Sequence, residues 1–437
     1  MARTGIGPTD QTRALAERIG GLAGEGAFEI AARTRALAAA GRDVIQLAIG
    51  EPDFAPPPRV VEAAVSALRN GDARYGPPEG LTVLRDAIAV SLRAVHVPAA
   101  AEQVVVTPGG KPALAYAVLS LVQQGDEVLV PDPGFPIYAS LVRFAGGTPV
   151  AYPVSTDGDP LPDDLALARL TPRARLVIIN SPHNPTGTVA SHAGLVRLAA
   201  AAERHDLTIL SDEVYARLVH APVHQALGDT SGVARPVRAP SIAAIPGLAE
   251  RTVVIDSFSK TYAMTGFRLG FGLFPRRLAR AAALLAVNVH SCVPAFVQRA
   301  GVAALEEPED LLHARRAELL GRRDAAVRAL RAIAGVECAE PRGAFYVFPR
   351  VENALRATGQ TSAAFCTRLL EAHGVALLPG SAFGTGGEGA VRLALTAPSA
   401  RIAEAIRRAR EVLEGDDRAG IPVRRARASA GSSGGAA

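Results

Sequence analysis

Lysine is nearly absent from this chain: of its 47 basic side chains only Lys111 and Lys260 are lysines, and the remaining 45 are arginines. Where a surface needs only positive charge the two residue types are broadly exchangeable, so a retained lysine suggests a task that arginine cannot perform. A deprotonatable primary amine can condense with an aldehyde and then transfer a proton. For a lysine considered alone, an ordinary exposed residue is an equally good interpretation, so the neighbouring residues decide.

Cysteine is also scarce, and Cys292, Cys338 and Cys366 lie far apart. Their spacing matches neither a metal site nor an even-numbered disulfide framework, so we expect reduced thiols. No uncharged stretch is long enough to span a membrane, and the N-terminal region lacks the apolar segment of a signal peptide. These absences favour a cytoplasmic protein that does not bind a membrane.

The net charge of the chain gives little evidence for a nucleic-acid partner. The net charge of +5 and pI near 9.4 come almost wholly from arginines spread over 437 residues and interleaved with acids. No zinc-finger, homeodomain or winged-helix pattern is present, so we expect no nucleic-acid partner. A hydrophobic content of 49% with 20% charged residues is typical of a compact soluble protein of two or three domains.

The order of hydrophobic patterns predicts an α/β fold. Short β-branched runs alternate with longer helical patterns, and they occupy residues 104–107, 127–130, 176–179, 207–210, 253–255 and 269–273. Near-continuous apolar strands separated by helices indicate a largely parallel sheet that is buried on both faces. Because ligands of such sheets bind at the carboxyl ends of the strands, the polar clusters that follow these runs are the candidate site residues.

The remaining segments are predicted as follows. A strand is expected at 44–49 and others at 343–348 and 391–395, in a smaller α+β domain. Helices are expected at 30–40, at 59–70, in a segment ending at Arg93, and at 277–287, 295–306, 308–334, 362–373 and 400–414. We predict a flexible arm for residues 1–27, a disordered tail for 415–437 and a surface loop for 221–247, of which 228–240 has no assigned purpose.

Two of the polar clusters point to a phosphate. Ser257, Ser259 and Lys260 follow the strand at 253–255, and Arg268 lies eight residues further on. Two hydroxyls, an amine and a guanidinium suit an anionic phosphate carried by an aldehyde. A second cluster, the Gly-Gly-Lys-Pro turn at residues 109–112, would point backbone amides at an anion held on a helix N-terminus, although for this motif alone an ordinary tight strand-to-helix turn is the more frequent explanation.

Three further clusters follow predicted strands or lie within them. Asn184 lies in a Pro-rich loop after residues 176–179 and can present its amide in a fixed direction. Asp212 follows a buried strand and needs a cationic partner there, or else caps the next helix. Arg392, inside an apolar strand, either pairs with a structural acid or forms a bidentate fork with a substrate carboxylate.

Taken together, these clusters resemble the class I/II aminotransferases of the aspartate aminotransferase superfamily, pyridoxal-phosphate fold type I, from about Ile30 to Glu414. The resemblance implies a large domain at 58–290, with a mostly parallel seven-stranded sheet flanked by helices. It implies a smaller α+β domain built from both chain ends, 28–57 and 291–414.

The resemblance also implies roles for individual residues, with pyridoxal 5'-phosphate as the cofactor. Lys260 would form the covalent imine with the cofactor, and Asp212 would pair with its pyridine nitrogen. Asn184 and Tyr215 would bond the ring oxygen, and Phe135 would stack on the ring. Lys260, Asp212 and Tyr215 are the expected catalytic residues.

Other residues match the family's binding groups. The phosphate-binding group is matched by Gly110, Lys111, Ser257, Ser259 and Arg268. Arg392 matches the arginine that grips the substrate α-carboxylate, with Gly50 and Asn184 beside it. Tyr75 resembles a tyrosine that reaches the phosphate of a neighbouring subunit, which implies a homodimer.

The implied activity is a ping-pong transfer of an amino group from an L-amino acid to a 2-oxo acid through aldimine and ketimine intermediates, in amino acid metabolism or biosynthesis. In it the freed Lys260 amine acts as a general base while Asp212 keeps the ring nitrogen protonated. The side-chain specificity and the role of the Lys111 side chain stay open.

Two alternatives use the same scaffold. A C–S lyase would release ammonia or a thiol without an oxo acid. A non-catalytic regulator usually carries an N-terminal DNA-binding domain, for which the residues before the first helix are too few.

Overall fold

The computed structural model describes residues 16–24, 26–220, 237–356 and 359–415. Residues 228–236 of the unassigned loop, most of the predicted N-terminal arm and all but the first residue of the predicted tail lie outside the described residues. Among the described residues no helix is both long and apolar enough to cross a membrane.

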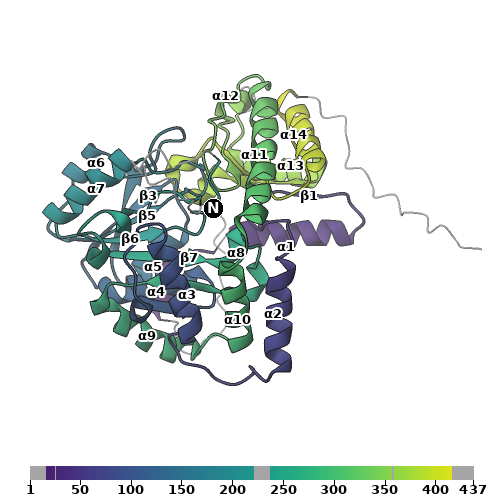
Figure 1. The fold of residues 1–437 in the computed structure, drawn as a ribbon. Helices are drawn as coiled ribbons and strands as arrows, with labels where there is room; N and C mark the ends of the chain where they lie inside the picture. The colour runs from purple at the N-terminus through teal and green to yellow at the C-terminus, as the bar shows by residue number, and fades with distance from the viewer. Residues whose placement is uncertain (1–15, 25, 221–236, 357–358, 416–437) are drawn as a thin grey trace, which may run out of the picture.

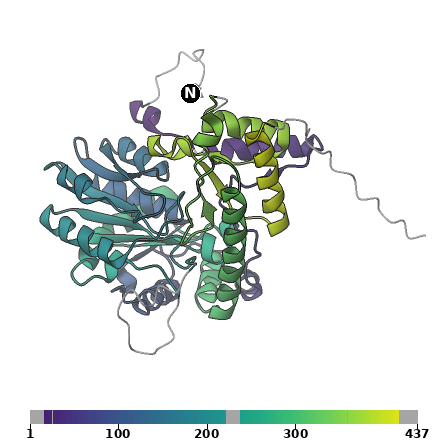
Figure 2. The ribbon, with the colours of Figure 1, turned by 90° about the horizontal axis from the view of Figure 1, so that it is seen from above.

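A seven-stranded sheet forms the centre of the larger part of the molecule (Figures 1 and 2). Its strands are β2 (Val104–Thr107), β3 (Glu127–Asp132), β4 (Thr148–Pro153), β5 (Ala174–Asn180), β6 (Thr208–Asp212), β7 (Thr252–Ser257) and β8 (Gly270–Leu273). The spatial order is β2-β8-β7-β6-β5-β3-β4, and only β8 runs antiparallel to its neighbours. The mostly parallel α/β sheet predicted from the sequence is confirmed.

Strand β4 was not predicted, and its environment explains why. It is the edge strand of the sheet, four of its six residues are exposed, and it contains Pro149 and Pro153. Edge strands tolerate proline and polar surface because one side of the strand has no hydrogen-bonding neighbour. A search for buried β-branched runs therefore passes over it.

Helices cover both faces of the sheet because successive strand residues point to opposite faces. Leu176 and Ile178 of β5 pack on one face with helices α4 (Gly110–Leu121), α5 (Ile137–Phe144) and α9 (Arg276–His290). Val177 and Ile179 pack on the other face with α7 (His192–Arg204), near the short α6 (Asp164–Ala168). Further along that second face lie α2 (Pro58–Arg69), α3 (Thr82–Arg93) and α10 (Ala295–Leu305).

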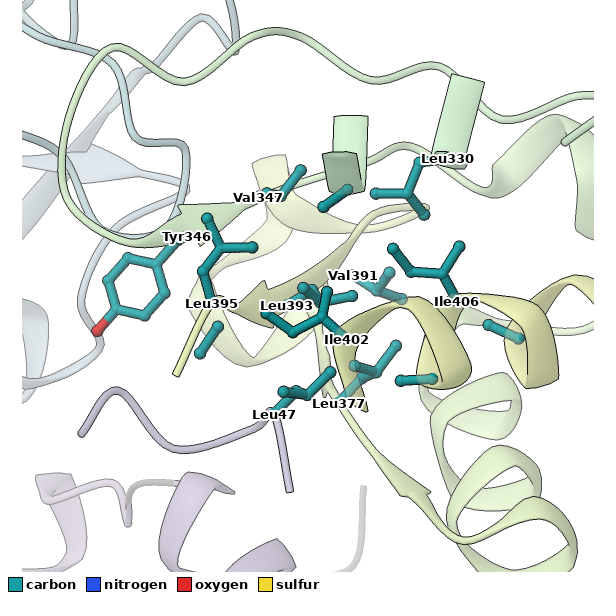
Figure 3. Packing of buried hydrophobic residues seen from close by; sticks show 14 of the residues in the cluster. Leu47, Leu330, Tyr346, Val347, Leu377, Val391, Leu393, Leu395, Ile402 and Ile406 are labelled. Atoms are coloured by element: carbon teal, nitrogen blue, oxygen red, sulfur yellow. The ribbon is translucent and has the colours of Figure 1, made fainter. Parts of the chain in front are cut away.

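The smaller part combines the segment before α2 with the C-terminal third of the chain. Its strands are β1 (Ile45–Gln46), β9 (Tyr346–Val347), β10 (Val375–Ala376), β11 (Leu378–Pro379) and β12 (Val391–Ala394). Its helices are α1 (Gly26–Ala39), α12 (Glu352–Leu355), α13 (Ser362–His373) and α14 (Ser399–Leu413). Figure 3 shows its core, with Tyr346 at one edge and the Tyr346 hydroxyl pointing away from the aliphatic side chains.

The packing of α10 and α11 (Glu309–Arg331) bears on where the two domains meet. Val297, Ala300 and Ala304 of α10 share a core with α2 and α3, although residues from 291 onward were assigned to the smaller domain. In α11, Leu312 belongs to that same core whereas Leu319 belongs to the core of the smaller part. We therefore propose that the boundary falls within α11, which runs from α10 toward the smaller part (Figure 1).

Two segments predicted as loose have defined structure in the residues that the structure describes, and one of them is partly buried. Ala239, Ile242 and Ala243, within the predicted surface loop 221–247, are buried. In the predicted N-terminal arm, residues 17–21 form a short 3-10 helix, and the Ala23 amide donates to the Ser140 hydroxyl of α5 at 3.0 Å. The surface-loop prediction is therefore wrong for residues 239–243.

Candidate active site

A cavity of about 490 Å³ opens at the carboxyl ends of the central strands and is lined by residues from both parts of the molecule. Twelve of the thirteen predicted site residues line it: Gly50, Gly110, Lys111, Phe135, Asn184, Asp212, Tyr215, Ser257, Ser259, Lys260, Arg268 and Arg392. The thirteenth, Tyr75, lies outside the cavity and is 92% exposed.

Lys260 provides an amine inside the cavity. It lies on the one-turn helix α8 (Phe258–Thr261), directly after β7, and its Nζ donates to the Gly50 carbonyl at 2.5 Å. Burial lowers the pKa of Lys260 to about 8, and the nearby cations Arg392, Arg268 and Lys111 add to the effect. Roughly a tenth of the amine is therefore unprotonated at neutral pH, far more than for an exposed lysine.

Asp212 provides a buried carboxylate at the end of β6. The Tyr138 hydroxyl donates to Oδ2 at 2.6 Å, and the Val214 amide donates to Oδ1 at 3.3 Å. Burial raises the pKa of Asp212 to about 6 despite these two hydrogen bonds. In the described part of the chain no ion pair includes Asp212, so its charge lacks a protein cation.

Asn180 connects Asp212 to the neighbouring loop. Its amide nitrogen donates to the Asp212 backbone carbonyl at 2.9 Å, and its carbonyl oxygen accepts from the Asn184 backbone amide at 2.8 Å. Asn180 thereby connects the backbone of Asp212 to the backbone of Asn184. Neither Tyr138 nor Asn180 was predicted, because their contacts with Asp212 join residues far apart in the sequence.

Arg392 lies in β12, and its guanidinium is buried against the cavity. Nη1 donates to Asn184 Oδ1 at 2.8 Å, and Nη2 donates to the Ala48 carbonyl at 2.6 Å. The guanidinium carbon lies 4.3 Å from the ring centre of Tyr346 and 4.9 Å from that of Phe383. Within the described residues no acid pairs with Arg392, and its Nε has no hydrogen-bond partner. Of the two sequence alternatives, the geometry favours a fork that is open to a carboxylate.

Tyr215 and Tyr346 form a buried pair beside Gly50. Their hydroxyl oxygens lie 2.7 Å apart, and the rings meet edge to face. A side chain at position 50 would collide with this pair, because a Cβ there would lie 1.9 Å from the Tyr346 hydroxyl oxygen. Gly50 is therefore required for the backbone to approach the site so closely.

Groups that can bind an anion line the cavity around the start of α4. Gly109 has a φ of 86°, and α4 begins at Gly110, so the amides of the first turn have no partner within the helix. The Ser257 hydroxyl donates to Ser259 Oγ at 2.8 Å. Arg268 reaches the same turn by donating to the Pro108 carbonyl at 3.3 Å. A helix N-terminus with hydroxyls and a guanidinium is a ready site for a phosphate.

Lys111 and Phe135 form part of the cavity wall. The Lys111 ammonium lies 5.5 Å from the centre of the Phe135 ring and 5.6 Å from that of Phe28. Phe28 belongs to α1 and is 63% exposed. It also lines the cavity, so α1 contributes part of the cavity wall. The two rings place a cation among apolar surfaces of the cavity.

The residues present fit pyridoxal phosphate. They include a carboxylate without a protein cation for a ring nitrogen, an amine of lowered pKa for an aldehyde, a set of anion-binding groups for a phosphate and an aromatic ring for stacking. No group of histidine, cysteine or acidic side chains that could hold a metal ion occurs among the described residues.

Comparison with known proteins identifies the same chemistry. The family model described as aminotransferase class I and II matches residues 42–408. An aspartate aminotransferase of Pyrococcus horikoshii is 36% identical over 378 residues, which is 86% of this chain and 92% of that protein. An arginine–pyruvate transaminase of Pseudomonas aeruginosa is 36% identical, over 89% of this chain and 95% of that protein.

Solved structures agree with this result. An aspartate aminotransferase from Thermus thermophilus with maleate superposes with a TM-score of 0.83 at 31% identity, over 92% of this chain and 100% of that one. An aromatic aminotransferase from Pyrococcus horikoshii superposes with a TM-score of 0.78 at 35% identity, over 89% and 99%. Sequence, fold and cavity thus lead to one conclusion: the chain is a pyridoxal-phosphate-dependent transaminase and belongs to the aminotransferase class I and II family.

Proposed function

We propose that this transaminase uses Lys260 as its nucleophile and general base, with Asp212 and Arg392 holding the cofactor and the substrate on either side. The observation that supports this most strongly is the position of all three in one cavity, where Lys260 has a lowered pKa and Asp212 a raised one. Groups whose charged forms are destabilised by burial are suited to exchange protons near neutral pH.

Pyridoxal phosphate, when bound, supplies an aldehyde that condenses with amines and a ring that accepts electrons from the substrate Cα. Above a pH of about 6 the Asp212 carboxylate is charged, and it would pair with the protonated ring nitrogen of the bound cofactor. The Lys260 amine would remove a proton from the substrate Cα and deliver it to the cofactor carbon. Its short contact with the Gly50 carbonyl orients the amine, and the surrounding protein lowers the pKa of Lys260.

The other predicted site residues bind the substrate or the cofactor. Arg392 offers a planar fork to the α-carboxylate, supported by its contacts with Asn184 and the Ala48 carbonyl. Asn184 and Tyr215 face the same cavity and suit a ring oxygen, while Phe135 suits the ring face. The phosphate would be bound by the backbone amides of Gly110 and Lys111, the hydroxyls of Ser257 and Ser259, and the guanidinium of Arg268.

We propose that the preferred amino donor carries a carboxylate on its side chain. Three cations besides Lys260 line the cavity, and two of them, Arg392 and Arg268, are assigned above to the α-carboxylate and to the phosphate. The third, Lys111, lies on the cavity wall with Phe28 and Phe135 beside its ammonium. Its positive charge can pair with a carboxylate on the substrate side chain. Several relatives are named aspartate aminotransferases, which supports the same choice.

An aromatic donor is the second candidate. Phe28, Phe135, Tyr346 and Phe383 give the cavity walls a large aromatic surface. One relative, from Thermococcus litoralis, is named an aromatic-amino-acid aminotransferase. Both candidates fit the cavity if the Lys111 side chain binds acidic donors and the aromatic rings contact aromatic donors.

A panel of amino donors tests these alternatives through the spectral change of the cofactor in the first half-reaction. The panel compares aspartate, glutamate, phenylalanine, tyrosine and arginine with the wild-type chain and Lys111→Gln. We expect the KM of acidic donors to rise about tenfold or more in the variant, and the KM of aromatic donors to change less than about threefold. An equal loss for both classes would exclude Lys111 as a side-chain determinant. Release of ammonia or a thiol without an oxo acid would point to the lyase alternative.

We further propose a homodimer. Tyr75 is outside its own cavity and 92% exposed, as expected for a side chain that serves a neighbouring subunit. Leu284 and Val287, one turn apart on α9, are also exposed, and an exposed apolar helix face favours association. Sedimentation would show a dimer, and Tyr75→Phe would weaken cofactor binding. A monomer with full activity would exclude this arrangement.

A cytoplasmic location is also proposed, since Cys292, Cys338 and Cys366 are all unpaired in the structure. Cell fractionation with an antibody to the chain tests it.

A further inference from the structure

Two carboxylates other than Asp212 lie at the same strand ends, and one arginine contacts both. Glu213 follows Asp212 directly, and Asp256 occupies the next strand, β7, which pairs with β6. Arg238 donates from Nη2 to Glu213 at 2.9 Å and from Nη1 to Asp256 at 3.0 Å. Its side chain is only 8% exposed.

Each of the two carboxylates also orders a neighbouring segment. The Glu213 Oε1 atom accepts from the hydroxyls of Ser211 at 2.9 Å and Ser241 at 2.6 Å. The Asp256 Oδ1 atom accepts from the Ser257 backbone amide at 2.7 Å. Ser257 belongs to the predicted phosphate-binding group, and Asp212 is predicted to pair with the ring nitrogen. Arg238 therefore contacts the residue next to each of them, Asp256 and Glu213.

The charges of this cluster act on Asp212. Both Glu213 and Asp256 disfavour the charged form of Asp212, in addition to its burial. The Arg238 guanidinium opposes two negative charges with one positive charge, so removing it would leave two buried carboxylates uncompensated. The other titratable neighbours of the cluster include Tyr138 on α5, Tyr215 after β6 and Tyr262 after α8, whose raised pKa values keep their hydroxyls neutral. One further cation, Arg217, lines the same small cavity as Arg238 and Asp256, and its charge is paired with Glu309.

We propose that Arg238 is a positioning residue of the active site, whose guanidinium balances Glu213 and Asp256 and so keeps Asp212 anionic toward the ring nitrogen of the cofactor. This inference rests on the proposed pairing of Asp212 with that nitrogen. Arg238 does not line the cavity, so it would touch neither the cofactor nor the substrate. Its effect reaches the site through the charge of its two partners.

The test uses the apoprotein and pyridoxal phosphate, and measures the dissociation constant between pH 5 and pH 8 by fluorescence titration. The pH below which binding is half lost is here called the acid limb. It reflects protonation of both Lys260 and Asp212. Because every variant keeps Lys260, a difference in the acid limb between variants is assigned to the charge on Asp212. Arg238→Met leaves one more uncompensated negative charge, so the acid limb should move up by on the order of one pH unit. Glu213→Gln removes a negative charge, so the acid limb should move down.

The double variant Glu213→Gln/Arg238→Met restores the net charge of the cluster and should return the acid limb close to that of the wild-type protein. Arg217→Met is the matched control. Arg217 is a neighbouring, half-buried arginine that pairs with Glu309 and bonds the Tyr262 hydroxyl at 2.7 Å, but contacts neither Glu213 nor Asp256. It should leave the acid limb unchanged.

Shifts of the same sign in Glu213→Gln and Arg238→Met, or a shift in Arg217→Met as large as that in Arg238→Met, would overturn the inference. If Arg238→Met does not fold, Glu213→Gln decides alone, since an unmoved acid limb contradicts the electrostatic role. A wild-type apoprotein that binds the cofactor with no acid limb would instead contradict the proposed role of Asp212.

Discussion

Two regions of the molecule bury charged side chains, and they treat the charges in opposite ways. In the smaller part, Arg408 of α14 is only 5% exposed and donates to Asp43 at 3.0 Å and to Glu404 at 2.8 Å. Hydrogen bonds from Arg401 and Arg408 lower the pKa of Asp43 to about 2, and those from Arg407 and Arg408 lower that of Glu404 to about 2. These charges are stabilised by the protein itself.

At the strand ends of the large part the shifts are reversed. Burial raises the pKa of Asp212 to about 6 and lowers that of Lys260 to about 8, so folding destabilises both charged forms. The comparison teaches that carboxylates paired with arginines, as in the smaller part, are stabilised by the fold itself, whereas a buried charge without a protein counter-ion marks a place for a ligand. Each prediction below changes one region and asks whether the other responds.

The largest effect is expected for Lys260→Ala, which removes the nucleophile and the base together. Turnover of the best amino donor should fall by at least about 10³-fold. Lys260→Arg is the matched control, because it keeps a positive charge but cannot deprotonate, and it should be equally inactive. Single-turnover kinetics with added cofactor measure both. Activity of Lys260→Ala within tenfold of wild type would assign the amine's role to Lys111.

Asp212→Asn should weaken cofactor binding at pH 8 by on the order of 10- to 100-fold, because a neutral amide cannot hold the ring nitrogen's proton. The folded-state pKa of about 6 sets the window in the wild-type protein. Above it the carboxylate is charged and binding is tight, and binding is lost as the pH falls through it. Fluorescence titration should show this pH dependence in the wild-type apoprotein and not in the variant. Equal pH dependence in both would contradict the assignment.

Arg408→Met should lower the free energy of unfolding by about 2–4 kcal/mol, because it removes a buried guanidinium from two carboxylates. The cofactor affinity should not change, since Arg408 does not line the cavity. Arg410→Met is the control: its pair with Glu414 is 51% exposed on the arginine side and should contribute less than about 1 kcal/mol. Urea denaturation with and without cofactor measures both variants.

The same network predicts how acid acts on the smaller part. The folded-state pKa of Asp43, about 2, lies below its ordinary value of 3.8. Its stabilising contribution is therefore complete above about pH 4 and is lost as the pH falls toward 2. Asp43→Asn should remove this contribution and lessen the loss of stability between pH 4 and pH 2, as measured by denaturation at each pH. A slope identical to that of the wild-type protein would contradict it.

Tyr138→Phe should have the smallest effect. The hydroxyl donates to Asp212 and favours its charged form, so its loss should raise the acid limb of cofactor binding by less than about one pH unit. The shift has the same sign as that predicted for Arg238→Met. An acid limb that moves down would show that the tyrosine disfavours the charge.

The sequence predicted the parts of the fold and site that local patterns encode. Six of the seven central strands were predicted from short, mostly apolar runs, and Lys260 was found because lysine is so scarce. The edge strand β4 was missed because it is exposed and contains proline. These successes and failures follow from burial, since only a buried strand must be continuously apolar.

The supporting residues of the site could not be predicted, because their roles depend on contacts between distant segments. Tyr346 bonds Tyr215 across 131 positions of sequence, and Tyr138 bonds Asp212 across 74. Arg238 lies in a Pro- and Ala-rich stretch without periodicity, and only the fold places it between Glu213 and Asp256. No spacing rule in one sequence reports such pairings.

The central claim is that the protein leaves Asp212 destabilised so that the cofactor can stabilise it. Its folded-state pKa of about 6 exceeds the ordinary 3.8, so the carboxyl's contribution to apoprotein stability is complete below about pH 4 and lost as the pH rises through 6. The most direct measurement is the free energy of unfolding of wild type and Asp212→Asn at pH 8, each with and without saturating pyridoxal phosphate. We predict that the variant is more stable than wild type by about 1–3 kcal/mol without the cofactor and less stable with it. A variant that loses the same stability in both conditions would contradict the claim.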